Sequence, residues 1–323
     1  MLINSLFILA GLALLIGGAD RFVVGAANIA RALDISPLVI GLTIVGVATS
    51  APEVLVGSVA ALDGKTSLAI GNAIGSNIAN IGLVLGCTAL VCPLLVKSLT
   101  LRREFLLMCA AIGIATLLLL DNYLSRLDGA ILVLCLVAAM WRIIHMAKTS
   151  SKSDPLAEEF KQELELEQTS SIAKSSLLLV VGLVLLLGGA ELLVRGAVAI
   201  AEEFGVSDLV IGLTIVAIGT SLPELAAAIM SVIKNEADIA IGNVIGSNLF
   251  NMLMVLGVPA LIHPAEVSPD VLLRDLPVMI LLTLAMGWRI FVHGHGKFNR
   301  IEGGFLFICF IGYQYWLFST ISA

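Results

Sequence analysis

The sequence has few charged residues. Charged side chains make up 13% of its 323 residues, against about 25% in soluble domains. Hydrophobic residues make up 59%, above the roughly 45–50% of soluble domains, and the mean hydropathy is +1.06. A soluble globule with so few charges could not cover its surface. The composition therefore indicates an all-α polytopic membrane protein and argues against a nucleic-acid binder or an enzyme.

The sequence also lacks a pattern of soft metal ligands. Its five cysteines lie in apolar runs with no Cys-x-x-Cys pair, so we expect reduced, buried thiols. The histidines lie at or near expected helix ends, and His293 and His295 are expected to be solvated rather than to form a metal pair. No cofactor is expected.

Apolar runs of about 20 residues predict ten transmembrane helices. The expected ranges are 3–28, 37–62, 69–96, 102–121, 127–147, 174–200, 208–233, 240–263, 271–292 and 302–321. A hydrophilic, acidic stretch at 148–173 is too short to fold alone and is interpreted as a linker. The expected organisation is therefore a five-helix unit at 1–147, the linker at 148–173 and a second five-helix unit at 174–323.

Basic residues predict the orientation. Loops after the odd-numbered helices carry thirteen lysines and arginines, and the opposite side carries four. The positive-inside rule puts the first side, with the linker, in the cytoplasm, so that both termini face outward.

The chain repeats itself. Residues 37–54 match 208–225 at twelve of eighteen positions, and residues 69–86 match 240–257 at twelve of eighteen. Both matches have an offset of 171 positions (208 against 37). Because each copy spans five helices, the second copy must enter the membrane from the opposite face. This pattern predicts two inverted five-helix repeats, an architecture typical of alternating-access transporters.

Two glutamates lie in the middle of expected helices. Glu53 and Glu224 occupy related positions in apolar runs of about 25 residues, where an ionisable group costs about 2.5–3.5 kcal/mol or more. No lysine or arginine lies at similar depth in the helices that carry the two motifs. A functional carboxylate pair explains this placement better than a structural one does.

Further oxygens accompany the two carboxylates. Pro52 and Pro223 cannot donate to the carbonyls of Ala48 and Gly219, which frees both carbonyls inside the membrane. Helical spacing brings hydroxyl and amide groups to the same region. These candidate ligands are Thr49, Ser50, Ser76, Asn77 and Asn80 in the first copy, with Thr220, Ser221, Ser247, Asn248 and Asn251 in the second. Asn72 and Asn243 begin the two polar stripes.

The pooled ligand set contains carboxylate, hydroxyl, amide and carbonyl oxygens. Such a set suits hard cations, above all Ca²⁺ and Na⁺, and disfavours zinc or copper. Two nearby carboxylates repel each other, so protons should compete with the metal ion.

The two motifs resemble the alpha repeats of the sodium/calcium exchanger family. The resemblance rests on Gly41 to Glu53 with Gly71 to Asn77, and on 212–224 with 242–248, and it extends over all ten expected helices. It looks closest to small bacterial inner-membrane members without a large regulatory domain. The resemblance implies that Glu53 and Glu224 ligate Ca²⁺ at the centre of helices 2, 3, 7 and 8, while helices 1 and 6 slide as the gate.

It also implies that the hydroxyl and carbonyl groups named above serve Na⁺ and Ca²⁺. Some relatives carry an acid in the second repeat where this chain has Asn251, related to Asn80; asparagine at both positions argues against potassium dependence. The Gly-Asn-x-x-Glu signature of the proton-coupled branch is absent.

The sequence therefore predicts a secondary antiporter that exchanges Ca²⁺ for Na⁺ across the cell membrane, with one chain sufficient for function. Exchange of Ca²⁺ or Na⁺ for H⁺ is the alternative, with the glutamates as proton carriers. A passive cation channel fits less well, because channels more often build pores from oligomeric rings.

Overall fold

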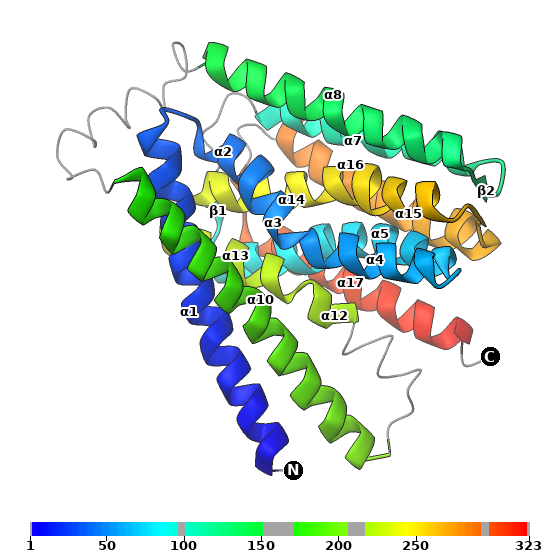
Figure 1. The fold of residues 1–323 in the computed structure, drawn as a ribbon, viewed down its shortest axis with the longest axis horizontal. Coiled ribbons are helices and arrows are strands. Elements are labelled where there is room, and N and C mark those ends of the chain that lie inside the picture. Colours follow the sequence, from blue (N-terminus) through cyan, green and yellow to red (C-terminus); the bar gives the residue numbers. More distant parts are fainter. Residues whose placement is uncertain (1, 96–100, 151–170, 206–216, 292–296, 322–323) are drawn as a thin grey trace.

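The computed structural model describes residues 2–95, 101–150, 171–205, 217–291 and 297–321, and these are nearly all helical. Figure 1 shows most helices running alongside one another, while α1 and α10 cross this bundle steeply and side by side. The first half contains α1 (Leu2–Ala32), α2 (Pro37–Ile40), α3 (Gly46–Thr49), α4 (Ala51–Leu62), α5 (Thr66–Ala79), α6 (Gly86–Val91), α7 (Leu101–Leu119) and α8 (Arg126–Ser150). The second contains α10 (Ile172–Glu203), α12 (Ala217–Thr220), α13 (Leu222–Ile233), α14 (Ala237–Phe250), α15 (Gly257–Ile262), α16 (Leu276–Phe291) and α17 (Arg300–Ile321).

Four π-helical segments interrupt these helices: η1 (Gly41–Val45), η2 (Asn80–Leu85), η4 (Asn251–Val255) and η5 (Val271–Asp275).

Seven described helices are long and apolar enough to cross a membrane, and the bent pair Pro37–Thr49 and Ala51–Leu62 makes up to eight. These agree with eight of the ten expected runs. The fourth expected run is α7, whose first turn holds three charged residues. The seventh, 208–233, lies partly outside the described residues, and its second half is α13. The chain is therefore a multi-pass, nearly all-helical membrane protein.

Glycine allows α1 and α10 to pack backbone against backbone. Gly11, Gly18 and Gly25 recur every seven residues on α1, which is about two helical turns. A Cβ on any of them would overlap main-chain atoms of α10, and Gly189 meets α1 in the same way. Small residues permit such close contact between membrane helices.

The two halves are interlocked. The first half's α6 packs on the second half's α17, and α15 packs on α8; α4 packs on α15, and α13 packs on α6. Each of these contacts has a counterpart in the other half of the chain. A helix of one half therefore completes the surroundings of a helix in the other.

Short antiparallel ladders join loops of the two halves. Strand β1 (Leu94–Leu95) pairs with β4 (Lys297–Phe298), and β2 (Tyr123–Leu124) pairs with β3 (Ala265–Glu266). The helices that follow β2 and β4 begin with reciprocal caps. Ser125 and Asp128 cap α8 by exchanging hydrogen bonds, and Asn299 and Glu302 cap α17 likewise.

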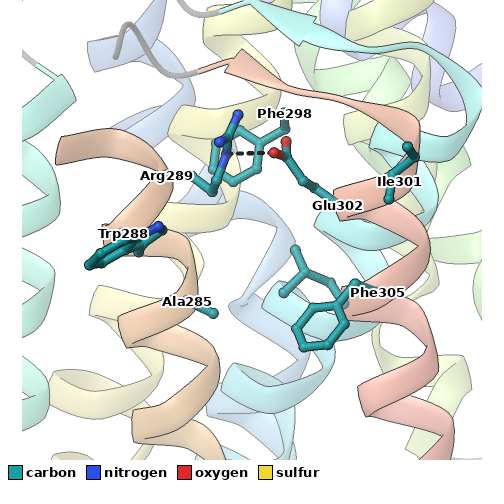
Figure 2. Close-up of a pocket in the computed structure, with 8 residues that line it drawn as sticks. Ala285, Trp288, Arg289, Phe298, Ile301, Glu302 and Phe305 are labelled. Atoms are coloured by element: carbon teal, nitrogen blue, oxygen red, sulfur yellow. Dashed lines mark ion pairs between the residues drawn. The ribbon is translucent and has the colours of Figure 1, made fainter. Parts of the chain in front are cut away.

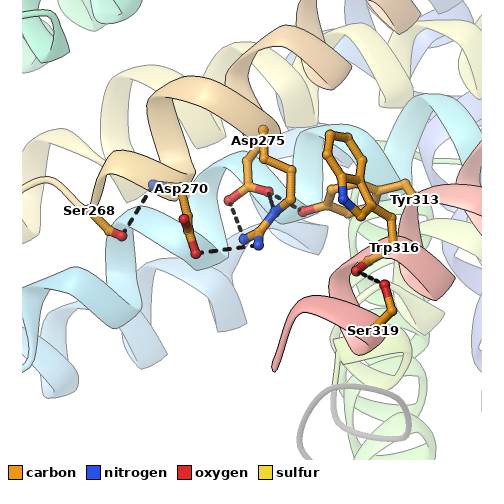
Figure 3. Close-up of polar contacts among 7 residues, drawn as sticks. Ser268, Asp270, Asp275, Tyr313, Trp316 and Ser319 are labelled. Atoms are coloured by element: carbon orange, nitrogen blue, oxygen red, sulfur yellow. Dashed lines mark hydrogen bonds and ion pairs between the residues drawn. The ribbon is translucent and has the colours of Figure 1, made fainter. Parts of the chain in front are cut away.

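Polar contacts hold α16 against α17 at both ends. At one end, Arg289 Nε forms an ion pair with Glu302 Oε1 at 2.7 Å (Figure 2). At the other end, Tyr313 donates to Asp275 Oδ1 over 3.0 Å, and Arg274 forms an ion pair with the same carboxylate at 2.7 Å (Figure 3). The two helices are thereby fixed as an antiparallel pair.

Two expectations from the sequence lie outside the described residues. Most of the predicted linker at 148–173 is not described, nor are His293 and His295. The five cysteines are free, but all are half-buried, whereas full burial was expected.

Candidate functional site

Two helix breaks form the centre of the site. Ser50 (φ −83°, ψ 1°) separates α3 from α4, and Ser221 (φ −90°, ψ 0°) separates α12 from α13. A proline follows two residues later in each case and cannot donate to the carbonyl four residues before it, Ala48 or Gly219. The first break bends the helix by 41°. The Thr-Ser-x-Pro-Glu sequence thus produces the same local structure twice.

The two breaks carry the two carboxylates. Glu53 and Glu224 lie in the first turns of α4 and α13, and each is 1% exposed. Glu53 is the charged neighbour of the Glu224 carboxyl group, and the Thr49 hydroxyl also lies beside that group. The structure therefore brings the predicted acidic pair together in the interior of the bundle.

Amide groups link each break to the following helix. Asn72 Nδ2 on α5 donates to the Glu53 carbonyl, and Asn243 Nδ2 on α14 donates to the Glu224 carbonyl, both over 3.4 Å. Ser76 and Ser247 each lie 3.5 Å from the side-chain oxygen of the asparagine one turn earlier. The same contacts thus recur at related positions.

A direct hydrogen bond joins the halves within the site. Thr49 Oγ1 lies 3.1 Å from Asn243 Oδ1 and 3.4 Å from Ser247 Oγ. Glycines make this approach possible, because a Cβ on Gly46 of α3 would meet the backbone of Gly246 on α14 at 3.1 Å. The predicted ligand Thr49 of the first half therefore lies against the polar stripe of the second.

The site contains many buried polar atoms without a hydrogen-bond partner among the described residues. They are Ser50 Oγ, Glu53 Oε2, Asn77 Oδ1, Asn80 Nδ2, both carboxylate oxygens of Glu224, both side-chain polar atoms of Asn248, and Asn251 Oδ1. Leaving such a group unpaired costs about 1–3 kcal/mol, more for a charged one. Such a group of unpaired polar atoms together with two carboxylates indicates a binding site for an ion or a polar ligand. Most of these atoms are oxygens.

Asn80 and Asn251 begin η2 and η4 and are each 1% exposed. Single π-helical turns inside α-helices occur frequently at functional sites, since they redirect side chains. The sequence pattern predicted continuous helices here, so the π-helical geometry is an addition from the structure.

The remaining candidates lie in the same region. Ser221 is 1% exposed, Gly219 is buried, and Ala48 and Thr220 are half-buried. In the described part of the chain, no three histidine, cysteine, aspartate or glutamate residues cluster as a metal site. A cation here would therefore be held by two carboxylates and neutral oxygens, which favours a hard ion.

Asn72 and Asn243 begin the polar stripes and are not among the ligands that the sequence predicts. Their contacts with the glutamate carbonyls make them positioning residues for the two breaks. Their position in the polar stripes was the sequence feature that could have indicated this positioning role.

Comparison with known proteins agrees with this geometry. The model of the family described as "Sodium/calcium exchanger protein" matches residues 3–144 and 174–319. "Putative antiporter CaxA" of Alkalimonas amylolytica is 48% identical over 321 residues, covering 99% of this chain and 100% of that protein. "Sodium/calcium exchanger MaX1" of Methanosarcina acetivorans is 32% identical, covering 98% of this chain and 99% of the relative.

A solved structure has the same fold. The sodium-calcium exchanger NCX_Mj, soaked with Na⁺ and Ca²⁺, matches with a TM-score of 0.82 and 32% identity, covering 96% of this chain and 97% of that one. Fold and relatives define a membrane antiporter of the cation/calcium exchanger type. The chain belongs to the sodium/calcium exchanger family, as the sequence motifs predicted.

Proposed function

We propose that this chain exchanges Ca²⁺ for Na⁺ across the cell's inner membrane by alternating access, with the linker in the cytoplasm and the termini outside. The observation that carries the proposal is the meeting of Glu53 and Glu224, both buried, at two related helix breaks. The name of the relative MaX1 supports sodium as the counter-ion.

In this proposal ten helices form two oppositely inserted halves, 1–147 and 174–323, within one chain. Contacts that recur at an offset of 171 support this arrangement: Asn72 with Glu53 matches Asn243 with Glu224. The β1–β4 and β2–β3 ladders form a second matched pair.

The proposed ligand cage combines the carboxylates of Glu53 and Glu224 with neutral oxygens. These come from Thr49, Ser50, Ser76, Asn77 and Asn80, from Thr220, Ser221, Ser247, Asn248 and Asn251, and from the carbonyls of Ala48 and Gly219. Many of these polar atoms are buried without a partner among the described residues, so a bound cation would satisfy them.

Competition couples the two ions. One cage cannot hold Ca²⁺ and a full set of Na⁺ together, and two uncompensated negative charges are costly to carry through the closed state. The carrier therefore changes sides only when Ca²⁺ or Na⁺ neutralises both carboxylates. If one net charge moves per cycle, the membrane potential adds about 2.3 kcal/mol per 100 mV.

A flux assay in inside-out vesicles tests the coupling ion. We expect uptake of Ca²⁺ to follow an imposed Na⁺ gradient and to continue when the pH gradient is collapsed. Uptake that ignores Na⁺ but follows pH would replace sodium with protons in this proposal. Uptake that needs no counter-ion at all would indicate a channel.

A further inference from the structure

A cavity of about 510 Å³ lies between α16 and α17, far along the sequence from the two helix breaks. Ala285 and Trp288 line it from α16, Phe305 and Leu306 line it from α17, and Phe298 precedes α17 (Figure 2). Its walls are almost wholly apolar. The ion pair of Arg289 with Glu302 lies at one end of it.

The cavity adjoins the lipid-facing surface. Trp288 and Phe305 are 58% and 60% exposed, and Ile301, which also lines the cavity, is more exposed still. In a membrane such surfaces face acyl chains, so a hydrocarbon tail can enter the cavity sideways. Tryptophan commonly marks the level of the lipid headgroups.

Positive charge gathers at the headgroup end. The exposed Arg300 begins α17, and Arg102 of α7 lies 5.6 Å over the Phe291 ring at the end of α16, while the charge of Arg289 is balanced by Glu302. Glu302 is already engaged by Arg289 and by the cap of α17. The N-terminus of α17 adds partial positive charge. A basic rim above an apolar cavity suits a lipid with a negative headgroup.

We propose that this cavity binds an anionic phospholipid, with one acyl chain between α16 and α17 and the phosphate at Arg300 and Arg102. The ligand differs in class from the transported cations, and the site requires neither Glu53 nor Glu224.

Lipid retention measures this site directly. The purified protein is mixed with equal phosphatidylglycerol and phosphatidylcholine, and bound lipids are counted by native mass spectrometry. We expect wild type to retain more phosphatidylglycerol than phosphatidylcholine. In Arg300→Gln this ratio should fall about fivefold, because one arginine near an anionic lipid surface contributes about 1 kcal/mol. Ala285→Phe, which fills the cavity, should reduce retention of both lipids.

Arg126→Gln is the matched control. Arg126 begins α8 and donates to the Ile262 carbonyl over 3.5 Å, as Arg300 begins α17 and donates to the Val91 carbonyl over 3.4 Å. Its retention pattern should equal that of wild type. Equal retention of the two lipids by wild type, or unchanged retention in Arg300→Gln and in Ala285→Phe, would overturn the proposal. Ala285→Leu replaces Ala285→Phe if the larger side chain prevents folding.

A second observation concerns how α1 is attached. Lys234, at the end of α13, forms an ion pair with Asp20 of α1 at 2.6 Å. Arg31, at the end of α1, pairs with Glu236 just before α14. The helix α1 also packs along α13, whereas among the described residues α10 has no comparable packing on α4, the related pair. At this end α1 is therefore attached to α13 and to the residue before α14, whereas α10 lacks such an attachment to α4 in the described part of the chain.

Related positions carry the opposite charges. An offset of 171 relates Arg31 to Glu202, at the end of α10, and relates Lys65, just before α5, to Glu236. Glu202 and Lys65 are both exposed here. The pair Arg31 and Glu236 thus has a related pair, Glu202 of α10 and Lys65, in which the signs of the two charges are exchanged.

We infer that Glu202 and Lys65 form an ion pair when α10 closes over α4, and that Arg31 and Glu236 then separate. This inference rests on the proposed alternating access. Each ion pair would stabilise the state in which its own end of the carrier is closed. Because only one pair forms at a time, neither end stays closed permanently.

Cysteine cross-linking in a background without native cysteines tests this exchange. We expect Arg31→Cys with Glu236→Cys, and separately Glu202→Cys with Lys65→Cys, to form disulfides, and each link to prevent the other when all four cysteines are present. Glu203→Cys with Lys65→Cys is the control, because Glu203 is bonded to Asn4 of α1.

Both disulfides in one molecule, or none between 202 and 65 under any ion condition, would refute the exchange. The flux assay is independent of this result. A protein that cross-links reciprocally but follows a pH gradient would refute sodium coupling while leaving this inference intact.

Discussion

At the scale of single residues, Glu53 and Glu224 are the central groups of the site. Both are buried and lie close to each other, and the helices that contain the two motifs have no lysine or arginine at similar depth. Neutral oxygens can complete a coordination shell, but among the described residues of the site only these two groups supply negative charge. The charge balance of any bound dication therefore depends on both.

Glu53→Gln and Glu224→Gln should each lower Ca²⁺ uptake by about 100-fold or more. Each substitution removes one negative charge from the site, and a loss of about 2.8 kcal/mol in binding free energy corresponds to that factor. Glutamine preserves the side-chain size, so the protein should remain folded. Isotope uptake into vesicles measures the effect. Glu104→Gln is the control, since Glu104 is also buried but lies on α7, outside the site. Normal uptake in either site variant would remove that residue from the cage.

Asn251→Asp should change the competition of Na⁺ and K⁺ with Ca²⁺, because it adds a third negative charge at the start of η4. Uptake of labelled Ca²⁺ at increasing Na⁺ or K⁺ measures this change. Asn299→Asp, at the cap of α17, is a suitable control, since aspartate caps helices equally well. An unchanged competition profile would mean that Asn251 lies apart from the ions.

At the scale of elements, the contact of α1 with α10 depends on which glycine faces it. A Cβ on Gly189 would meet the backbone of Leu15, whereas a Cβ on neighbouring Gly188 meets nothing within 4 Å. Two adjacent glycines on one helix therefore have different roles.

Gly189→Ala should destabilise the protein by about 1–3 kcal/mol through overpacking, and Gly188→Ala should be neutral or stabilising by up to about 1 kcal/mol. Thermal unfolding in detergent compares the two variants. A melting temperature lowered equally by both substitutions would show that α1 and α10 are not in backbone contact there.

The sequence predicted these elements unevenly. The helix breaks at Ser50 and Ser221 were predictable, because proline removes a known hydrogen bond. The π-helical turns at Asn80 and Asn251 were not, since the pattern of polar residues is the same in an α-helix. The packing of α1 on α13 also could not be foreseen, because the repeat predicts equal contacts in both halves and the structure shows unequal ones.

At the scale of the whole molecule, the proposed inversion assigns related positions to opposite sides of the membrane. Leu33 directly follows α1 and Phe204 directly follows α10; an offset of 171 relates them, and both are exposed. A membrane-impermeant maleimide should label Phe204→Cys from outside intact cells and Leu33→Cys only after the membrane is opened, in a background without native cysteines. Labelling of both positions from the same side would contradict the inversion.

The resemblance of the two motifs was enough to predict the family, and the sequence repeat was enough to predict that the two acidic motifs are related. It did not predict the strand ladders, because β1 to β4 have only two residues each and no alternating pattern can be recognised at that length. Such short strands depend on tertiary packing rather than on local propensity.

The interlocking of the halves has a consequence for synthesis. While the ribosome is still making the second half, α6 lacks α17 and α8 lacks α15, and β1 and β2 lack their strands. The helices of the first half can enter the membrane but cannot complete their packing until translation ends. The nascent first half must therefore wait in a partly packed state, and this interval is when quality-control proteases have the best access to it.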